Sequence, residues 1–362
     1  MRDVVLVPDL ALEGWRSMDR YAAALAARIT GVTVASEAGR IGGPRYLARY
    51  LSYPAALRHY RPAAVHIADH SYAHCLRAFP GIASAVTLHD LYPLEVLARG
   101  GGGMRAAVRD RLLRWVVSWV RRADRWIAGS RFTAGEAARL LGLSADRMTV
   151  IPYGVDEAFG RRPAEGVIVR RRGGWLGATG ATAAARIVLH VGTCEPRKGI
   201  ETALRTVGLL RAGGVEAILV QIGGRLSPAQ HGVAAEAGVQ ACLVQEPCVD
   251  EGVLIAAYHA ADTLILPSWY EGFGLPALEA AAAGLPVVTS GAGGLPEAAG
   301  PSALIAPAGD AGAFAAAVAR VLTDETVRTA LADAGREHAA RHSWDRTARL
   351  TAEVYDGLAT TS

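Results

Sequence analysis

The segment Gly192-Thr-Cys-Glu-Pro-Arg-Lys-Gly199 places two adjacent cations between glycines. It follows an apolar run that ends at Val191 and precedes a helical pattern that begins near Ile200, so Arg197 and Lys198 belong to a strand-to-helix loop. The dipole and the free amides of a helix N-terminus favour anions. Because arginine offers a planar fork and lysine a compact charge, the pair is typical of diphosphate binding. Two solvated loop cations are the alternative.

Lys198 is the only lysine among the 38 Lys and Arg residues of the chain, which also lacks asparagine. This bias, together with the abundance of alanine, indicates a GC-rich genome that uses arginine wherever a cation suffices. We interpret Lys198 as a position that arginine cannot fill, with chance as the alternative.

A second segment, Ser268-Trp-Tyr-Glu-Gly-Phe-Gly-Leu-Pro-Ala-Leu-Glu279, follows the apolar run Thr263–Leu266 and carries two carboxylates. Pro276 suits the first turn of a helix, because its missing N–H would have no partner there. The amides near the helix start would then be free to bind an anion. Glu271 on the loop and Glu279 one turn into the helix would flank that site, where carboxylates fit sugar or ribose hydroxyls better than phosphate. A loop charge and a helix-dipole partner are the alternatives.

Three other polar segments follow predicted strands. The loop Ser290-Gly-Ala-Gly-Gly-Leu-Pro-Glu297 is either a second phosphate nest or a tight turn. His89 and Asp90 end another strand, and a histidine in such a position is more often structural than catalytic. A histidine-rich cluster lacks the spacing of metal ligands, so no metal is expected. Its members are His66, Asp69, His70 and His74.

Twelve short apolar runs, bounded by polar or turn residues, recur along the chain. Such runs are typical of strands buried on both faces of a parallel sheet, and the helical patterns between them indicate an α/β fold. Six runs in each half predict two doubly wound, Rossmann-like domains that face each other across a cleft, with ligands at the carboxyl ends of the strands. The runs are Val4–Val7, Val32–Ala35, Ala64–Ala68, Ala85–Leu88, Trp126–Ala128, Met148–Ile151, Ile187–Val191, Ala217–Ile222, Ala241–Val244, Thr263–Leu266, Pro286–Thr289 and Ala303–Ala306.

The first domain is predicted to span residues 1–165 and the second residues 186–340. Between them, residues 166–185 contain arginines and glycines with little periodicity, which predicts a linker and loop. Residues 341–362 carry a last helix. Its apolar face would consist of Trp344, Ala348, Leu350 and Tyr355.

The 362 residues are 51% hydrophobic and 20% charged, so the chain can bury large cores and is not a disordered polymer. No run of about eighteen apolar residues is free of charge, and Asp9 interrupts the N-terminus too early for a signal peptide, so we expect a cytoplasmic protein. The four cysteines form no CxxC pair, which excludes a disulfide framework and a zinc knuckle. A net charge of +4 does not imply a nucleic-acid partner.

An apolar stripe runs through residues 104–126, with arginines around it. A core-packing helix is the favoured interpretation; a peripheral helix attracted to anionic lipid at the inner face of the membrane is the alternative. The stripe consists of Val108, Leu112, Trp115, Val116, Trp119 and Val120, and the arginines are Arg105, Arg109, Arg111, Arg114, Arg121, Arg122 and Arg125.

The segment from Glu271 to Glu279 is similar to the acidic motif of glycosyltransferase family 4, whose members are retaining enzymes of the GT-B architecture. The resemblance covers nearly the whole chain. The other motifs that carry it are Ala128-Gly-Ser130-Arg-Phe, Val150-Ile-Pro-Tyr-Gly-Val-Asp156, Gly192 to Gly199, Tyr258-His-Ala-Ala-Asp262, Gly293-Gly-Leu-Pro-Glu297 and the final helix from Trp344 to Tyr355.

The resemblance implies that the second domain binds a nucleotide-linked sugar. Arg197 and Lys198 would neutralise the diphosphate and favour departure of the nucleotide. Glu271 would bind hydroxyls of the donor sugar, and Glu279 those of the ribose. The amides that would help to hold sugar and phosphate are those of Gly272, Phe273, Gly274 and Leu275.

For the first domain, the resemblance implies that His89 lies near the reacting centre and that the acceptor is bound there. The acceptor-side or cleft positions would be Gly14, Trp15, Asp90 and Ser130. The implied reaction transfers a hexosyl group, with mannose favoured, from a UDP- or GDP-linked donor to a hydroxyl of a saccharide, glycolipid or natural product. It keeps the anomeric configuration and needs no metal or other cofactor. The terminal helix would cross back to the first domain, and the cleft would close on substrate.

The chain also departs from the family pattern. Relatives carry a glycine-rich loop after the first strand, whereas Pro8-Asp-Leu-Ala-Leu-Glu-Gly14-Trp-Arg holds one glycine, so no phosphate contact is carried over to it. Tyr153 stands where relatives often have asparagine. A sugar-nucleotide epimerase of the same fold and an inactive sugar-nucleotide-binding scaffold are the alternative functions. A phosphorylase would need Lys198 for PLP, and the absence of GxGxxG after a strand and of GxxxxGK[ST] disfavours a dehydrogenase and a P-loop NTPase.

Overall fold

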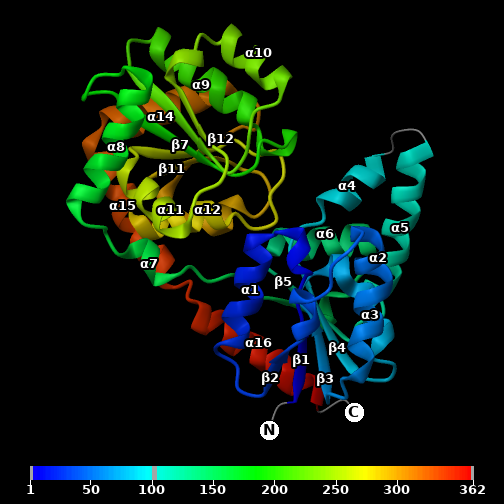
Figure 1. Ribbon diagram of the computed structural model, residues 1–362. Helices are drawn as coiled ribbons and strands as arrows, with labels where there is room; N and C mark the ends of the chain where they lie inside the picture. The colour runs from blue at the N-terminus through cyan, green and yellow to red at the C-terminus, as the bar shows by residue number, and fades with distance from the viewer. Residues whose placement is uncertain (1–2, 100–103, 360–362) are drawn as a thin grey trace. The chain divides into compact units, whose positions relative to one another are not determined.

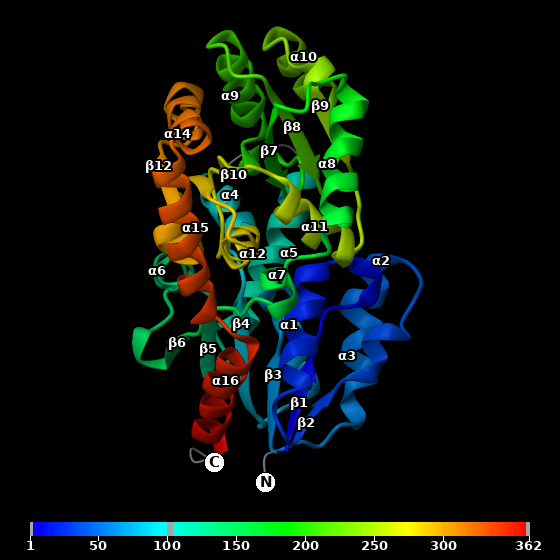
Figure 2. The ribbon, with the colours of Figure 1, turned by 90° about the vertical axis from the view of Figure 1, so that its left-hand side faces the viewer.

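The computed structural model describes residues 3–99 and 104–359, including all their side chains except those of residues 16, 99, 104–109 and 359. The chain divides into two compact units. The first comprises Met1–Gly154 together with Trp344–Ser362, and the second comprises Val155–Ser343. Each unit contains one parallel sheet, shown from two directions in Figures 1 and 2. The first unit thus ends its main segment at Gly154 rather than at the predicted residue 165.

All twelve predicted strands are present among the described residues, which confirms the two-domain α/β fold. The first sheet has the order β2-β1-β3-β4-β5-β6 and the second the order β12-β11-β10-β7-β8-β9. The strands are β1 (Val4–Val7), β2 (Val32–Val34), β3 (Ala64–Ile67), β4 (Ala83–Leu88), β5 (Arg125–Ala128), β6 (Met148–Val150), β7 (Arg186–Val191), β8 (Ala217–Ile222), β9 (Leu243–Glu246), β10 (Thr263–Leu266), β11 (Val287–Ser290) and β12 (Ala303–Ala306). Strand β9 begins later than predicted because Gln240–Cys242 forms a 3₁₀ turn.

The helices that connect the strands pack on both faces of each sheet, as right-handed crossovers require. In the first unit they are α1 (Arg16–Ala26), α2 (Arg45–Leu47), α3 (Tyr53–Ala56), α4 (Tyr92–Arg99), α5 (Met104–Val120), α6 (Arg131–Leu141) and α16 (Trp344–Ala359). In the second they are α7 (Glu157–Gly160), α8 (Glu165–Thr179), α9 (Ile200–Ala212), α10 (Pro228–Glu236), α11 (Glu251–Ala260), α12 (Leu275–Ala283), α13 (Leu295–Ala299), α14 (Ala311–Thr323) and α15 (Glu325–Ala340). Helices α9 and α14 contact each other, and α8, α11, α12 and α15 form a second contiguous set.

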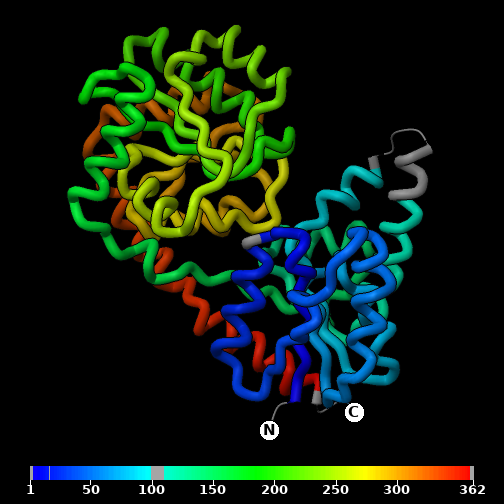
Figure 3. The backbone as a smooth tube through the Cα atoms, in the orientation of Figure 1, coloured from blue at the N-terminus to red at the C-terminus, as the bar shows by residue number. Residues whose placement is uncertain are grey.

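The predicted terminal helix is α16, and it belongs to the first unit although the preceding α15 belongs to the second. Figure 3 follows the chain from α15 into α16. Helix α16 packs against α1 and the first sheet, where the Tyr355 hydroxyl lies 2.6 Å from Nδ1 of His66 on β3. Trp344 is buried against the rings of Tyr21 and Tyr153. These contacts make α16 an integral part of the first unit's core.

The predicted linker at residues 166–185 is wrong, because most of it forms helix α8. Ile168 and Trp175 are buried seven residues apart on one side of this helix. Arg172 donates to Asp262 Oδ2 (3.0 Å) and to the carbonyl of Ala185 (2.7 Å), which fastens the helix to the second sheet. Several glycines with low helix propensity hid the helix in the sequence.

The apolar stripe predicted within residues 104–126 packs into the first unit. Val116 and Val120 are buried, Trp119 packs against the core, and Arg111 and Arg114 are exposed. The part of the stripe at Val108, with Arg105 and Arg109, lies outside the described side chains. Within the described part of the chain, no helix has the length and apolar character needed to cross a bilayer.

Candidate functional site

The candidate donor site lies at the carboxyl ends of β7 and β10, where the second sheet reverses the direction in which its strands are added. Ligands of doubly wound sheets bind at such a switch point. The loop after β7 ends in the 3₁₀ turn Pro196–Lys198, and α9 begins at Ile200 directly after it. The loop after β10 leads through Glu271 to α12. The topology therefore brings together the two segments that the sequence singled out.

Lys198 and Glu271 form an ion pair between these loops. The Lys198 Nζ donates to Oε2 of Glu271 at 2.6 Å and to Oε1 at 2.9 Å. Both side chains are about 15% exposed, so the pair is only partly screened by water. Arg197 Nε donates to Glu195 Oε2 at 2.8 Å within its own loop. In this structure, each predicted phosphate-binding cation therefore has a carboxylate partner.

The backbones of the two loops are fastened to each other. The Trp269 N–H donates to the carbonyl of Arg197 at 2.7 Å. Gly199 has a φ of 66°, and a Cβ atom there would lie 2.1 Å from the carbonyl oxygen of Pro267. Only glycine fits this position, because of both its left-handed backbone and the close approach. The fixed contact sets the separation of Lys198 from the β10 loop.

The third glycine-rich loop, Ser290–Glu297, supports the Glu271 loop from behind. Gly294 N–H donates to the Glu271 carbonyl at 2.8 Å. A Cβ atom would lie 2.0 Å from the Glu271 carbonyl oxygen if added at Gly293, and 2.5 Å from that of Gly272 if added at Gly294. The contacts therefore favour the tight turn over the phosphate nest, because the glycines let the backbones of the two loops approach closely.

Helix α12 begins as predicted, with Pro276 in its first turn. Its N-cap, Gly274, has a φ of 106°, and its C-cap is Gly284 with a φ of 70°. The Ala277 N–H donates to the Gly274 carbonyl within the first turn. The predicted amide donors Gly272, Phe273, Gly274 and Leu275 lead directly into this helix.

Glu279 is buried in the second unit, one turn into α12. It is 4% exposed, and its Oε2 accepts the hydroxyl proton of Tyr258 at 2.8 Å. Tyr258 comes from α11, within the motif that ends at Asp262. The Asp262 carboxylate accepts the Ile187 N–H at the start of β7 (2.7 Å). The sequence did not assign a contact to Tyr258, because it comes from another element.

In the first unit, His89 lies at the carboxyl end of β4 and is 7% exposed. Its Nε2 is 2.7 Å from the Ala68 carbonyl and its Nδ1 is 2.5 Å from the Tyr153 hydroxyl. In the neutral tautomer that fits both, Nε2–H donates and Nδ1 accepts. Burial lowers the pKa of His89, which keeps the ring neutral at pH 7. The structure thus assigns His89 a structural pairing with Tyr153, whose ring also covers Gly129.

The other predicted first-unit residues lie at strand ends. Asp90 Oδ1 accepts the Tyr92 N–H at the start of α4 (3.1 Å), and the buried Ser130 Oγ accepts the Thr133 N–H at the start of α6 (3.0 Å). Ser130 is the N-cap of α6, whereas Asp90 turns the chain two residues before the N–H that it accepts. Gly14 is exposed with a φ of 67°, and Trp15 follows it as the N-cap residue of α1.

A polar cluster at the switch point of the first sheet, between β1 and β3, was not predicted from the sequence. Arg49 donates to Glu13 Oε1 at 3.1 Å and to the Ser71 carbonyl at 2.8 Å, and it lies 4.3 Å above the Tyr72 ring. Asp9 is 4% exposed, and burial together with the Asp69 charge raises its carboxyl pKa well above the ordinary value. Arg49 comes from a segment that carries no motif, so its contact was invisible in the sequence.

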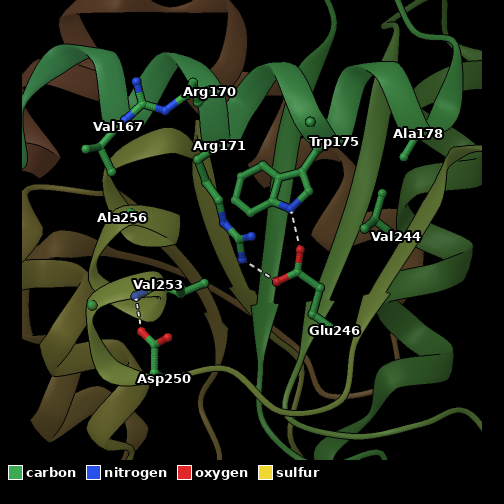
Figure 4. A pocket seen from close by; sticks show the side chains of 12 residues that line it. Val167, Arg170, Arg171, Trp175, Ala178, Val244, Glu246, Asp250, Val253 and Ala256 are labelled. Atoms are coloured by element: carbon green, nitrogen blue, oxygen red, sulfur yellow. Dashed lines mark hydrogen bonds and ion pairs between the residues drawn. The ribbon is translucent and has the colours of Figure 1, made fainter.

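A groove of about 620 Å³ lies elsewhere on the second unit, beside β9 and between α8 and α11 (Figure 4). At its centre Glu246 accepts hydrogen bonds from Arg171 and from the Trp175 indole N–H, while Arg171 Nε has no partner among the described residues. Within residues 3–99 and 104–359, no group of three or more side chains has the arrangement of a metal site.

Solved structures with the same fold include the sucrose-phosphate synthase of Thermosynechococcus elongatus, with a TM-score of 0.77, 22% identity and full coverage of both chains. The Anabaena protein HepE in complex with UDP-glucose has a TM-score of 0.78 and 17% identity, covering 99% of this chain and all of that one. At these identities the likeness shows the fold, which is the two-domain GT-B fold.

Two family models match the chain: residues 10–159 match "Glycosyltransferase Family 4" and residues 185–324 match "Glycosyl transferases group 1". The chain is 32% identical over 319 residues to the glycogen synthase of Mycobacterium tuberculosis, covering 82% of this chain and 69% of that protein. It is 34% identical over 249 residues to the D-inositol 3-phosphate glycosyltransferase of Thermobispora bispora, covering 64% of this chain and 56% of that protein. The match thus spans about half the length of the curated relatives of that name. The chain belongs to glycosyltransferase family 4.

Proposed function

We propose that the protein is a retaining glycosyltransferase that moves a hexosyl group from a UDP- or GDP-linked donor to an acceptor hydroxyl. The ion pair of Lys198 and Glu271 at the second switch point carries this proposal, because it places a cation for phosphate beside a carboxylate for sugar hydroxyls. Relatives named for transfer to D-inositol 3-phosphate and for glycogen synthesis support a polyhydroxylated acceptor. Saccharides, glycolipids and glycosylated natural products share that chemistry.

The donor replaces contacts that the two loops now make with each other. Its diphosphate takes Lys198 from Glu271, and a hydroxyl of its sugar replaces the ammonium as hydrogen-bond donor to that carboxylate. Lys198 and Arg197 then stabilise the negative charge that develops on the departing nucleotide. We assign Glu279 to the ribose hydroxyls. For His89 we keep the place near the reacting centre that the resemblance implies, with the ring held in its neutral form by Tyr153 and the Ala68 carbonyl. No cofactor or metal takes part in these steps.

The first experiment is calorimetric binding of UDP, GDP and their hexose conjugates to wild type and to Lys198→Ala. The donor set includes GDP-mannose, which carries the sugar favoured by the sequence, and UDP-glucose, with which HepE forms a complex. We expect one nucleotide series to bind and its affinity to fall about 10- to 100-fold in Lys198→Ala, as for the loss of a charged hydrogen bond. Arg320→Ala removes an exposed cation of the same unit and serves as the control.

The lone lysine gives a second readout. An amine-reactive reagent modifies Lys198 and the N-terminus only, so donor protection of Lys198 is measured by mass spectrometry without mutation. Absence of binding and protection with every nucleotide overturns the proposal and indicates a degenerate protein that keeps the motifs only as inherited architecture. Binding without donor turnover identifies the inactive sugar-nucleotide-binding scaffold. Conversion of a bound sugar nucleotide to its epimer without acceptor identifies an epimerase instead.

A further inference from the structure

A buried polar pair lies beneath the donor loop. His190, on β7, is 1% exposed, and the parallel register places it beside Gln221 of β8, which is fully buried. Among the described residues, neither His190 ring nitrogen nor Gln221 Oε1 has a partner at normal hydrogen-bond geometry. Leaving such atoms unpaired costs about 1–3 kcal/mol each. A purely structural strand would avoid this cost with apolar side chains, so the pair points to a second state of the site.

The pair is in direct contact with the donor loop. A Cβ atom added to Gly192 would lie 3.8 Å from Cε1 of His190 and 3.9 Å from Cδ of Lys198, so the ring and the lysine chain flank the same glycine. Gln221 Nε2 donates to the Gly192 carbonyl at 2.9 Å. A change in the contacts of Lys198 therefore changes the immediate surroundings of the His190 ring.

The charged groups that face His190 are Lys198, from the 3₁₀ turn, and Glu271, from the loop after β10; β8 contributes the neutral Gln221. Burial and the Lys198 charge lower the pKa of His190 to about 4, while the backbone of Lys198 and the Glu271 charge act in the opposite direction. At pH 7 the ring is therefore neutral while Lys198 and Glu271 are paired.

We propose that His190 is a positioning residue of the donor site that takes up a proton from solvent when a nucleoside diphosphate sugar binds in the Gly192–Gly199 loop. The inference rests on the proposed function. The diphosphate adds two negative charges beside Lys198 and so favours the imidazolium form through the same electrostatic route by which Glu271 acts. The protonated ring then donates from both nitrogens, and we assign Gln221 Oε1 and the Lys198 backbone as its acceptors.

The test is calorimetry of wild type with the nucleoside diphosphate hexose that binds, at about pH 6.5 in MES and in imidazole. These buffers differ in ionisation enthalpy, so the difference in observed heat gives the number of protons taken up. A sugar conjugate is used because a free nucleoside diphosphate has a terminal phosphate that titrates near pH 6. We expect net proton uptake by wild type, and an affinity that rises about tenfold from pH 7.5 to 5.5 if His190 regains an ordinary pKa of about 6.5.

His190→Gln keeps a hydrogen-bonding side chain that does not titrate, and it should bind with no proton uptake and a flat pH profile. His231→Gln, at an exposed histidine of α10, should behave as wild type. Donor binding by wild type without proton uptake, or equal uptake by His190→Gln, overturns the inference and leaves the proposed function intact. Failure of wild type to bind any donor overturns both. Where His190→Gln does not fold, the absence of proton uptake by wild type still overturns the inference.

Discussion

The Glu271 carboxylate has two competing partners, because it pairs with Lys198 in the structure and is proposed to bind a hydroxyl of the donor sugar. The Lys198 ammonium is therefore already neutralised before a ligand arrives. A nucleoside diphosphate without sugar must break this pair, and it provides no hydroxyl to donate a hydrogen bond to Glu271. A sugar conjugate offers a hydroxyl.

Glu271→Gln should accordingly change the affinities for the two ligand types in opposite directions. Removal of the competing charge should tighten binding of the nucleoside diphosphate by about 3- to 10-fold, or up to about 1.4 kcal/mol. The affinity for the sugar conjugate should fall, because the glutamine amide oxygen is a weaker acceptor for the sugar hydroxyl than the Glu271 carboxylate. Calorimetry with both ligands checks this, with the exposed Glu325→Gln as control. Weaker binding of both ligands by the same factor would refute the competition.

The buried histidines make the stability of the protein depend on pH. Burial lowers the pKa of His66 to about 3 and those of His74 and His190 to about 4. The unfolded chain takes up protons below about pH 6.5 and the folded chain does not, so the free energy of unfolding should fall as the pH drops from 6.5 to 4. Each histidine contributes up to about 1.4 kcal/mol per pH unit. Urea unfolding at pH 7, 6 and 5 measures this slope.

His66→Gln should reduce that slope by the share of one histidine. Glutamine retains polar atoms for the Tyr355 and Thr87 hydroxyls, which lie 2.6 and 2.7 Å from the ring nitrogens. An unchanged slope would mean that His66 is charged in the folded state.

The sequence singled out Lys198, Arg197 and Glu271 as candidates because each lies in a local motif next to a predicted strand. It did not reveal that Lys198 and Glu271 pair with each other, since 73 residues separate them. His190 was hidden inside an apolar run, and Arg49 in a segment without a motif. Local patterns thus predict which loops form the site, while the partners of individual side chains depend on tertiary packing.

Among the structural elements, the loops after β7 and β10 are held at a fixed separation because the backbone of Gly199 packs against the Pro267 carbonyl. Gly199→Ala should cost about 1–2 kcal/mol for its left-handed backbone, plus the clash with the Pro267 carbonyl. Gly180→Ala at the end of α8 has nearly the same φ, 65°, with nothing within 4 Å of the added Cβ. It should therefore show the backbone cost alone.

Chemical denaturation measures the loss of stability in both variants, and the difference between the two losses is the cost of the clash. Donor affinity should fall only in Gly199→Ala. Equal stability losses in the two variants would show that the loops separate easily.

Helix α8 shows why residues 166–185 were wrongly predicted to be a linker. Its glycines mask a helix whose stability comes from Trp175, Ile168 and Arg172, each anchored to other elements. Gly173 and Gly177 are exposed, with no heavy atom within 4 Å of an added Cβ. Gly173→Ala/Gly177→Ala should therefore raise the free energy of unfolding by about 1–2 kcal/mol. Gly173→Pro should lower it by about 3 kcal/mol, whereas a flexible linker would tolerate both changes.

At the scale of the whole molecule, the two units differ in continuity. Val155–Ser343 is one uninterrupted segment, whereas the first unit needs α16 from the far end of the chain. A fragment of residues 155–343 should unfold cooperatively and bind a nucleoside diphosphate on its own. Residues 1–154 should remain unfolded until a peptide of residues 344–362 supplies Trp344 and Tyr355. Circular dichroism with and without the peptide tests this, and a stable fragment 1–154 alone would contradict it.

The discontinuity of the first unit also fixes an order of events on the ribosome. At about 5–20 residues per second, the roughly 190 residues between Gly154 and Trp344 take about 10–40 s to synthesise. Throughout that time the nascent first unit exposes the side of its sheet that α16 later covers, so it is a substrate for holding chaperones. The second unit, although made later, is the first to reach its native state.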